Sequence, residues 1–150
     1  MKRGHTLTET EMIEALREEG SRVTGQRIAI VEFLAGRRDH PSARQIYNHV
    51  RIREPKISLT TVYNTLKALV ARDLIREIEF NEAENRFDTN LAPHANLVCS
   101  CCGAIVDFDQ PLPLPVDEVL RKTGFEAREF RVEYRGFCGA CRGRKKGSKP

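Results

Sequence analysis

Residues 58–67 read Ser58-Leu-Thr-Thr-Val-Tyr-Asn-Thr-Leu-Lys67, and they predict a helix that begins after Ser58. Serine is a favoured N-cap, and Val62, Leu66 and Leu69 recur along one helical face. The polar and aromatic side chains of the first turns would then be exposed, where such groups can contact base edges and phosphates. An ordinary capped amphipathic helix explains the same pattern. The candidate DNA contacts in this stretch are Ser58, Thr60, Thr61, Tyr63, Asn64 and Lys67.

Three shorter helices are predicted before this stretch. The first follows the capping-box pattern of Thr8 and Glu11, the second follows the candidate N-cap Thr24, and the third begins at Pro41-Ser42. After the fourth helix the spacing of the apolar residues changes from a helical pattern to a strand-like one. Residues 74–80 are partly alternating, and residues 86–88 could be the returning strand of a hairpin. Short helices followed by a hairpin predict a winged helix-turn-helix, in which the helix after Ser58 would enter the major groove.

Charge is distributed unevenly along the chain. Residues 22–72 contain ten lysines and arginines but only three acidic residues, whereas residues 86–141 contain six basic and eight acidic residues. A basic module beside a mildly acidic one favours a polyanionic partner, although a solvated basic surface is the alternative. Arg22, Gln26 and Arg27 surround a predicted helix N-terminus, which suits a phosphate. They complete the set of candidate DNA contacts.

The overall composition indicates a globular protein. The chain has 150 residues, of which 40% are apolar and 31% are charged. No apolar run approaches the roughly 20 residues that a membrane span needs. Residues 1–20 are polar and carry no apolar core of a secretory signal. We therefore expect a cytoplasmic protein without a membrane partner.

All five cysteines lie in the last third of the chain. Four of them form two Cys-x-x-Cys pairs, Cys99 with Cys102 and Cys138 with Cys141, and 35 residues separate the pairs. Two such turns can complete a closed four-thiolate zinc site, which would be structural because it leaves no position for a substrate. Redox-active dithiols and unrelated buried cysteines are the alternatives. Cys101 is left over, and no role is expected for it.

The second half of the chain predicts a small α/β module. Residues 96–98 and 105–108 have the pattern of strands that flank the first cysteine turn, residues 116–122 could be a short helix, and Phe130, Val132 and Tyr134 alternate with charged residues. The fold class is therefore α+β. We expect a winged-helix domain over residues 1–85, a hinge at about 84–92, a zinc-binding domain over 93–141 and a basic, disordered tail over 142–150.

A second metal site is predicted from imidazole and carboxylate groups. Strand alternation would point His94 and Asn96 the same way, and Asp107 lies on the predicted partner strand. Asp88 ends the hairpin region, and His40 lies between helices of the first module. Such ligands without thiolate suit iron or manganese, although a helix-entry residue at His40 and a turn residue at Asp88 are the alternatives.

Taken together, these motifs resemble the ferric uptake regulator family of metal-dependent bacterial repressors. The resemblance runs from about Leu16 to Cys141. Within the family, the chain is most similar to the peroxide-sensing PerR-type branch, because Asn64 follows Tyr63 where the iron-uptake branch usually carries Arg. The motifs that carry the resemblance are Arg22-Val-Thr-Gly-Gln-Arg27, His40-Pro-Ser-Ala43, Ser58 to Leu66, Arg86-Phe-Asp88, Cys99-x-x-Cys-Gly103, Ile105-Val-Asp-Phe108 and Gly136-Phe-Cys-x-x-Cys141.

The resemblance implies a homodimer, formed through the C-terminal α/β dimerisation domain, whose winged helices each bind half of an AT-rich inverted repeat in double-stranded DNA. Each subunit would hold one structural Zn²⁺ and one regulatory Fe²⁺ or Mn²⁺. In the family's peroxide sensors, Fe²⁺ reacts with hydrogen peroxide, a ligand histidine is oxidised, the metal leaves and DNA is released. His40 and His94 match the oxidised positions. The regulatory ligands would be His40, Asp88, His94, Asn96 and Asp107.

One position departs from the family pattern, because the family usually has His where this chain has Asn96. A carboxamide oxygen is a poorer, neutral ligand than imidazole. The site could bind metal more weakly, prefer manganese, or use four protein ligands and a water. The primary interpretation is a metal-dependent, peroxide-sensing repressor and not an enzyme. The alternatives are an iron- or manganese-responsive repressor of the same family without peroxide sensing and, from another class, a thiol oxidoreductase.

Overall fold

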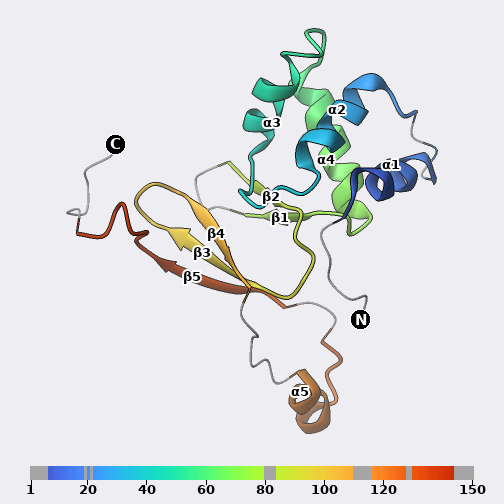
Figure 1. Cartoon of the computed structure of the whole chain (residues 1–150). Coiled ribbons are helices and arrows are strands. Elements are labelled where there is room, and N and C mark those ends of the chain that lie inside the picture. The colour runs from blue at the N-terminus through green and yellow to red at the C-terminus, as the bar shows by residue number, and fades with distance from the viewer. Residues whose placement is uncertain are drawn as a thin grey trace. The chain divides into compact units, whose positions relative to one another are not determined.

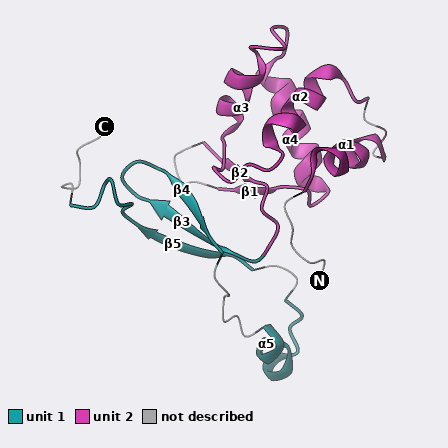
Figure 2. Ribbon diagram, in the orientation of Figure 1, with its two compact units in different colours: residues 1–3, 93–150 teal, residues 4–92 magenta. Residues whose placement is uncertain are grey.

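The computed structural model describes residues 7–18, 20, 22–79, 84–109, 116–127 and 130–143. These residues fall into two compact units, which Figure 2 colours magenta and teal. We call residues 4–92 the helical unit and residues 93–150 the sheet unit. Each unit is described by itself.

The helical unit contains four helices followed by a two-stranded antiparallel hairpin (Figure 1). This order is the outline of a winged helix-turn-helix, as the sequence predicts. The elements are α1 (Glu9–Glu18), α2 (Gly25–Leu34), α3 (Ala43–Val50), α4 (Leu59–Ala71), β1 (Arg76–Ile78) and β2 (Arg86–Asp88).

Short polar side chains define where these helices begin. The Thr24 hydroxyl accepts a hydrogen bond from the amide of Arg27 at the start of α2. The Ser58 hydroxyl accepts one from the amide of Thr61 at 3.0 Å at the start of α4. Ser42 forms a complete capping box at the start of α3. The predicted helix starts are therefore confirmed, because each cap satisfies an amide that has no partner within its own helix.

The helices pack around one apolar core to which all four contribute. Ile30, Leu34, Ile46 and Leu69 are each completely buried. Burial of one such side chain stabilises a fold by about 1.5–3 kcal/mol, so this core is the main stabilising feature of the helical unit. Its other members include Met12, Leu16, Val31, Val50, Val62, Leu66, Ile75 and Phe87.

The hairpin is shorter than its sequence pattern. β1 pairs antiparallel with β2 in a register that places Arg76 opposite Asp88. The alternating pattern begins at Leu74, but the Leu74 amide bonds the Leu69 carbonyl at 3.0 Å and Ile75 is buried in the helical core. Both residues therefore close the end of α4 instead of joining the strand. Residues 80–83 lie outside the described part of the chain.

The sheet unit contains a three-stranded sheet of order β4-β3-β5 and one helix. Its elements are β3 (Ala95–Cys99), β4 (Ile105–Phe108), α5 (Val116–Thr123) and β5 (Val132–Gly136). They agree with the predicted strands and helix, except that Phe130 precedes β5. Residues 110–115, which include three prolines, and most of the predicted tail, residues 144–150, fall outside the described residues.

The topology of this sheet brings its two cysteine turns together. β3 pairs antiparallel with β4 and parallel with β5, and Cys99 is opposite Gly136 in the parallel pair. Because β3 and β5 run the same way, the turns that follow them leave the sheet at the same end. None of the helices within the described ranges is long and apolar enough to cross a membrane.

Candidate metal centres and DNA-binding surface

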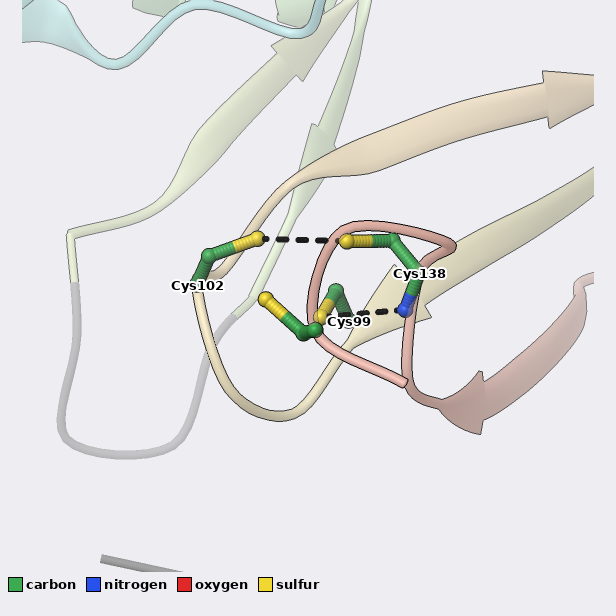
Figure 3. A group of neighbouring side chains, drawn as sticks. Cys99, Cys102 and Cys138 are labelled. Carbon is green, nitrogen blue, oxygen red and sulfur yellow. Dashed lines mark hydrogen bonds between the residues drawn. The ribbon is translucent and has the colours of Figure 1, made fainter. Parts of the chain in front are cut away.

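The four paired cysteines form one cluster in the sheet unit (Figure 3). The sulfur atoms of Cys99, Cys102, Cys138 and Cys141 all lie within 4.8 Å of one another, and those of Cys102 and Cys138 are 3.8 Å apart. Four sulfurs at about 2.3 Å from a tetrahedral zinc ion would be about 3.8 Å from each other. The donor set and its spacing therefore fit a closed zinc site.

Local backbone geometry builds this cluster. The Gly103 amide bonds the Cys99 carbonyl at 2.9 Å, and Gly103 takes a positive φ of 71°, which glycine tolerates without strain. The Cys138 amide donates to the Cys99 sulfur at 3.3 Å, the second contact drawn in Figure 3. These turns hold the two pairs against each other.

The cysteines of the cluster shift the pKa values of one another's thiols. Backbone amides, first that of Cys102 and then that of Cys138, lower the pKa of Cys99 to about 6. Side-chain hydrogen bonds with Cys101 and then Cys138 raise the pKa of Cys141, because they favour its neutral thiol. A bound dication would take all four ligands as thiolates. Cys101 is half-buried and lies outside the set of four mutually close sulfurs.

In the helical unit, His40 and Asp88 form a buried pair. Both residues are 2% exposed, and His40 Nε2 is 3.6 Å from Asp88 Oδ1. His40 lies in the loop before α3, and Asp88 ends β2. The same carboxylate oxygen accepts a 2.7 Å hydrogen bond from the backbone amide of Asn90, which fixes its orientation. An imidazole and a carboxylate held in this way fit the donor set of a first-row divalent metal.

The sheet unit contains a second pair of the same kind. His94 Nε2 is 3.6 Å from Asp107 Oδ1, and the two side chains are 2% and 6% exposed. Asn96 follows His94 by two residues and lies on β3, directly opposite Asp107 on β4. Its carboxamide oxygen is buried and has no hydrogen-bond partner among the described residues. A buried oxygen without a partner is unfavourable, and a cation would relieve it.

Sequence reasoning missed polar residues that lie beside these pairs. Thr89 and Asn90 are each 2% exposed and follow Asp88 directly. Glu133 lies opposite Asn96 in β5 and forms an ion pair with Arg135. A polar pair after the Arg-Phe-Asp motif was the only available signal for Thr89 and Asn90. Nothing in the sequence places Glu133 beside β3, because its pairing is long-range.

The candidate DNA contacts lie at the starts of α2 and α4, except for Lys67, which lies further along α4. Most are exposed, and Tyr63 is 41% exposed. Thr61 is half-buried, and its hydroxyl bonds that of Ser58 at 2.9 Å, so these two residues serve the helix start. The Arg27 guanidinium donates to the Arg22 carbonyl at 3.4 Å. The exposed members are Arg22, Ser58, Thr60, Tyr63, Asn64 and Lys67, and the half-buried ones are Gln26, Arg27 and Thr61.

A winged helix followed by a sheet unit whose four-thiol cluster fits zinc defines a winged-helix protein with a candidate zinc site. The chain belongs to the ferric uptake regulator family, whose model matches residues 18–135. This family comprises metal-dependent transcriptional regulators, which bind DNA and function as dimers, and the related proteins are regulators rather than enzymes. The resemblance seen in the sequence is thereby confirmed.

Similar proteins include both peroxide and metal regulators. The chain is 37% identical over 132 residues to the peroxide operon regulator of Bacillus subtilis, which covers 87% of this chain and 91% of that protein. It is similar in structure to PerR of Streptococcus pyogenes, a protein of peroxide sensing and gene regulation. The identity is 31% and the TM-score 0.51, and the match covers 94% of this chain and 98% of that one. It is also similar in structure to a zinc-bound manganese uptake regulator. The identity is 28% and the TM-score 0.65, and the match covers 88% of this chain and 99% of that one.

Proposed function

We propose that this protein is a metal-dependent transcriptional repressor that senses peroxide. Cys99, Cys102, Cys138 and Cys141 bind structural Zn²⁺, and one regulatory Fe²⁺ or Mn²⁺ binds the histidine–carboxylate pairs of both units. The observation that carries the proposal is that each unit presents its own buried pair, with a nitrogen-to-oxygen distance of 3.6 Å in both. Two ligands do not complete the coordination of a first-row metal, whereas two pairs together supply four.

Joint binding explains how a metal could control DNA affinity. His40 and Asp88 belong to the helical unit, and His94, Asn96 and Asp107 belong to the sheet unit. An ion held by all of them restricts the angle between the units. In a homodimer, the two winged helices must fit half-sites about 34 Å apart, one turn of B-DNA. Restricting the units to the one arrangement that fits DNA raises the apparent affinity for DNA, because fewer molecules occupy arrangements that cannot bind it.

Peroxide would reverse this effect through the ligand histidines. When bound, Fe²⁺ supplies the electron that peroxide needs to generate an oxidant beside His40 and His94. Oxidation of either imidazole removes a ligand that the helical or the sheet unit contributes, so the units are released from each other. We propose cytoplasmic action on an AT-rich inverted repeat, read by Tyr63 and Asn64 and anchored on phosphates by Lys67, Arg22 and Arg27.

A second candidate is an iron- or manganese-responsive repressor without peroxide sensing. Asn96 favours it, because an oxygen ligand in place of an imidazole shifts the preference of the site from Fe²⁺ towards Mn²⁺, even though both ions are then bound more weakly. The two candidates share the same ligands, the same zinc site and the same DNA. They differ only in whether peroxide changes the Fe²⁺ form.

One experiment separates these candidates. The protein is purified without air, its zinc, iron and manganese are counted, and operator binding of the Fe²⁺ and Mn²⁺ forms is measured before and after peroxide. Peroxide sensing predicts loss of binding for the Fe²⁺ form alone, with an added oxygen on His40 or His94 in the mass spectrum. Unchanged binding of both forms supports the second candidate.

A matched pair of variants tests the regulatory site itself. His40→Ala should abolish metal-dependent operator binding and leave one zinc per chain, whereas His49→Ala, at an exposed position on α3, should not. Metal-dependent affinity that survives in His40→Ala would exclude both candidates.

A further inference from the structure

The backbone of His40 adopts a conformation that needs support. His40 has a positive φ of 48°, in the left-handed region that residues other than glycine rarely occupy, and it is 2% exposed. Such a conformation persists only where the surrounding structure holds it. The loop around His40 must therefore be fixed by contacts outside itself.

Those contacts come from β2 and the residue that follows it. The Phe87 amide donates to the Pro41 carbonyl at 3.0 Å, and Arg86 Nη1 donates to the His40 carbonyl at 3.5 Å. The Thr89 hydroxyl donates to the Arg37 carbonyl. The loop and the strand thus run antiparallel. The last of these contacts joins Arg37, three residues before His40, to Thr89, one residue after Asp88.

This arrangement fixes the two ligands of the helical unit relative to each other. Asp88 lies between Phe87 and Thr89, whose hydrogen bonds to the loop therefore bracket it. We propose that Thr89 is a positioning residue, whose buried hydroxyl holds the His40 loop against β2 and so presents His40 and Asp88 as a preformed pair of metal ligands. The proposal rests on the function proposed above and adds a residue to its regulatory site.

Thr89 is the contact that can be tested most cleanly. The Phe87 contact is a backbone amide that substitution leaves in place. Arg86 also donates to Gln45 Oε1 at 3.1 Å, and that atom belongs to the capping box of α3. Among the described residues, the Thr89 hydroxyl makes one hydrogen bond, and valine removes it while the shape of the side chain is kept. Groups that orient metal ligands change metal affinity by about 10–100-fold when they are removed.

The test compares three variants of the full-length, zinc-loaded protein. Mn²⁺ affinity is measured by the electron paramagnetic resonance signal of the free ion, together with zinc content and melting temperature. Thr89→Val should weaken Mn²⁺ binding by about tenfold or more, and Thr89→Ser, which keeps the donor, should restore it to within about twofold. The matched control is Thr65→Val, because Thr65 is a fully buried threonine of the same unit whose hydroxyl donates to the Thr61 carbonyl at 2.8 Å.

Each outcome supports or overturns the proposal. Weaker Mn²⁺ binding in Thr89→Val alone, with one zinc per chain in all variants, supports it. Equal weakening in Thr65→Val, or no rescue by serine, shows a general loss of stability and overturns it. Wild-type affinity in Thr89→Val also overturns it, and His40→Ala then tells whether the regulatory site stands: if His40→Ala still loses Mn²⁺, only the role of Thr89 is wrong.

Discussion

Asn96 and Asp107 lie directly opposite each other in the antiparallel β3–β4 pair. Opposed residues of two strands project to the same face of the sheet, so the carboxamide and the carboxylate share one environment. The Asn96 oxygen is buried there without a hydrogen-bond partner among the residues described. This relationship places position 96 where a ligand for a metal at Asp107 would be needed.

Asn96→His should therefore tighten Mn²⁺ binding by about tenfold, because imidazole is the stronger ligand for a first-row metal. Isothermal titration of the zinc-loaded protein with Mn²⁺ measures the change. The control is Asn48→His, which adds the same group at an exposed position on α3 and should change nothing. If both variants bind Mn²⁺ as the wild type does, position 96 does not face the metal.

Loss of one zinc ligand should destabilise the sheet unit. Cys102→Ser breaks the four-thiolate set, and because zinc binding contributes directly to folding, the melting temperature should fall by roughly 10 °C or more. Elemental analysis and calorimetry give zinc content and melting temperature. Cys101→Ser should keep one zinc per chain and a melting temperature close to that of the wild type. Equal zinc loss in the two variants would assign Cys101 to the site.

The salt dependence of DNA binding tests the proposed phosphate contact of α4. Lys67 is exposed, and replacing it with Gln should weaken operator and nonspecific DNA alike. The slope of log affinity against log salt should fall by about 0.9 for each subunit. Lys122→Gln, in α5 of the sheet unit, is the control and should leave the slope unchanged. A constant slope in Lys67→Gln places Lys67 away from the phosphates.

The two expected roles of Ser58 can be separated by two substitutions. Ser58→Ala removes the cap of α4 and should lower the free energy of unfolding by about 1 kcal/mol. Ser58→Asp keeps a capping oxygen and should keep stability, but its charge should weaken DNA binding more than alanine does. Denaturant unfolding and fluorescence anisotropy measure the two effects.

Thr8→Asp makes the same change at the capping box of α1, outside the predicted DNA surface, and should affect neither quantity. If Ser58→Asp binds DNA as tightly as the wild type, Ser58 caps the helix but does not lie against DNA.

Features with local causes could be predicted from the sequence. The N-caps Thr24 and Ser58 act on amides three residues away, so their helix starts can be read from a short stretch. The two Cys-x-x-Cys turns carry their own spacing, and the first of them sets the β3–β4 hairpin that places Asn96 opposite Asp107. Each of these signals lies within about a dozen residues of its effect.

Features that depend on distant partners could not be predicted. The parallel pairing of β3 with β5 places Glu133 opposite Asn96, although no periodicity in either strand specifies that neighbour. Thr89 acts on the carbonyl of Arg37, 52 residues earlier in the chain. The ends of β1 were also misplaced, because Ile75 joins the helical core instead of the strand. Tertiary packing overrides local pattern at these positions.

The parallel pairing of β3 and β5 has a consequence for biosynthesis. Cys99 and Cys102 are translated before Cys138 and Cys141, and at about 5–20 residues per second the ribosome needs roughly 2–7 s to make the chain between them. During that interval the nascent polypeptide carries two bare thiols next to a strand that has not yet gained its neighbour. A zinc ion held by all four thiols would therefore bind only after the second turn has emerged.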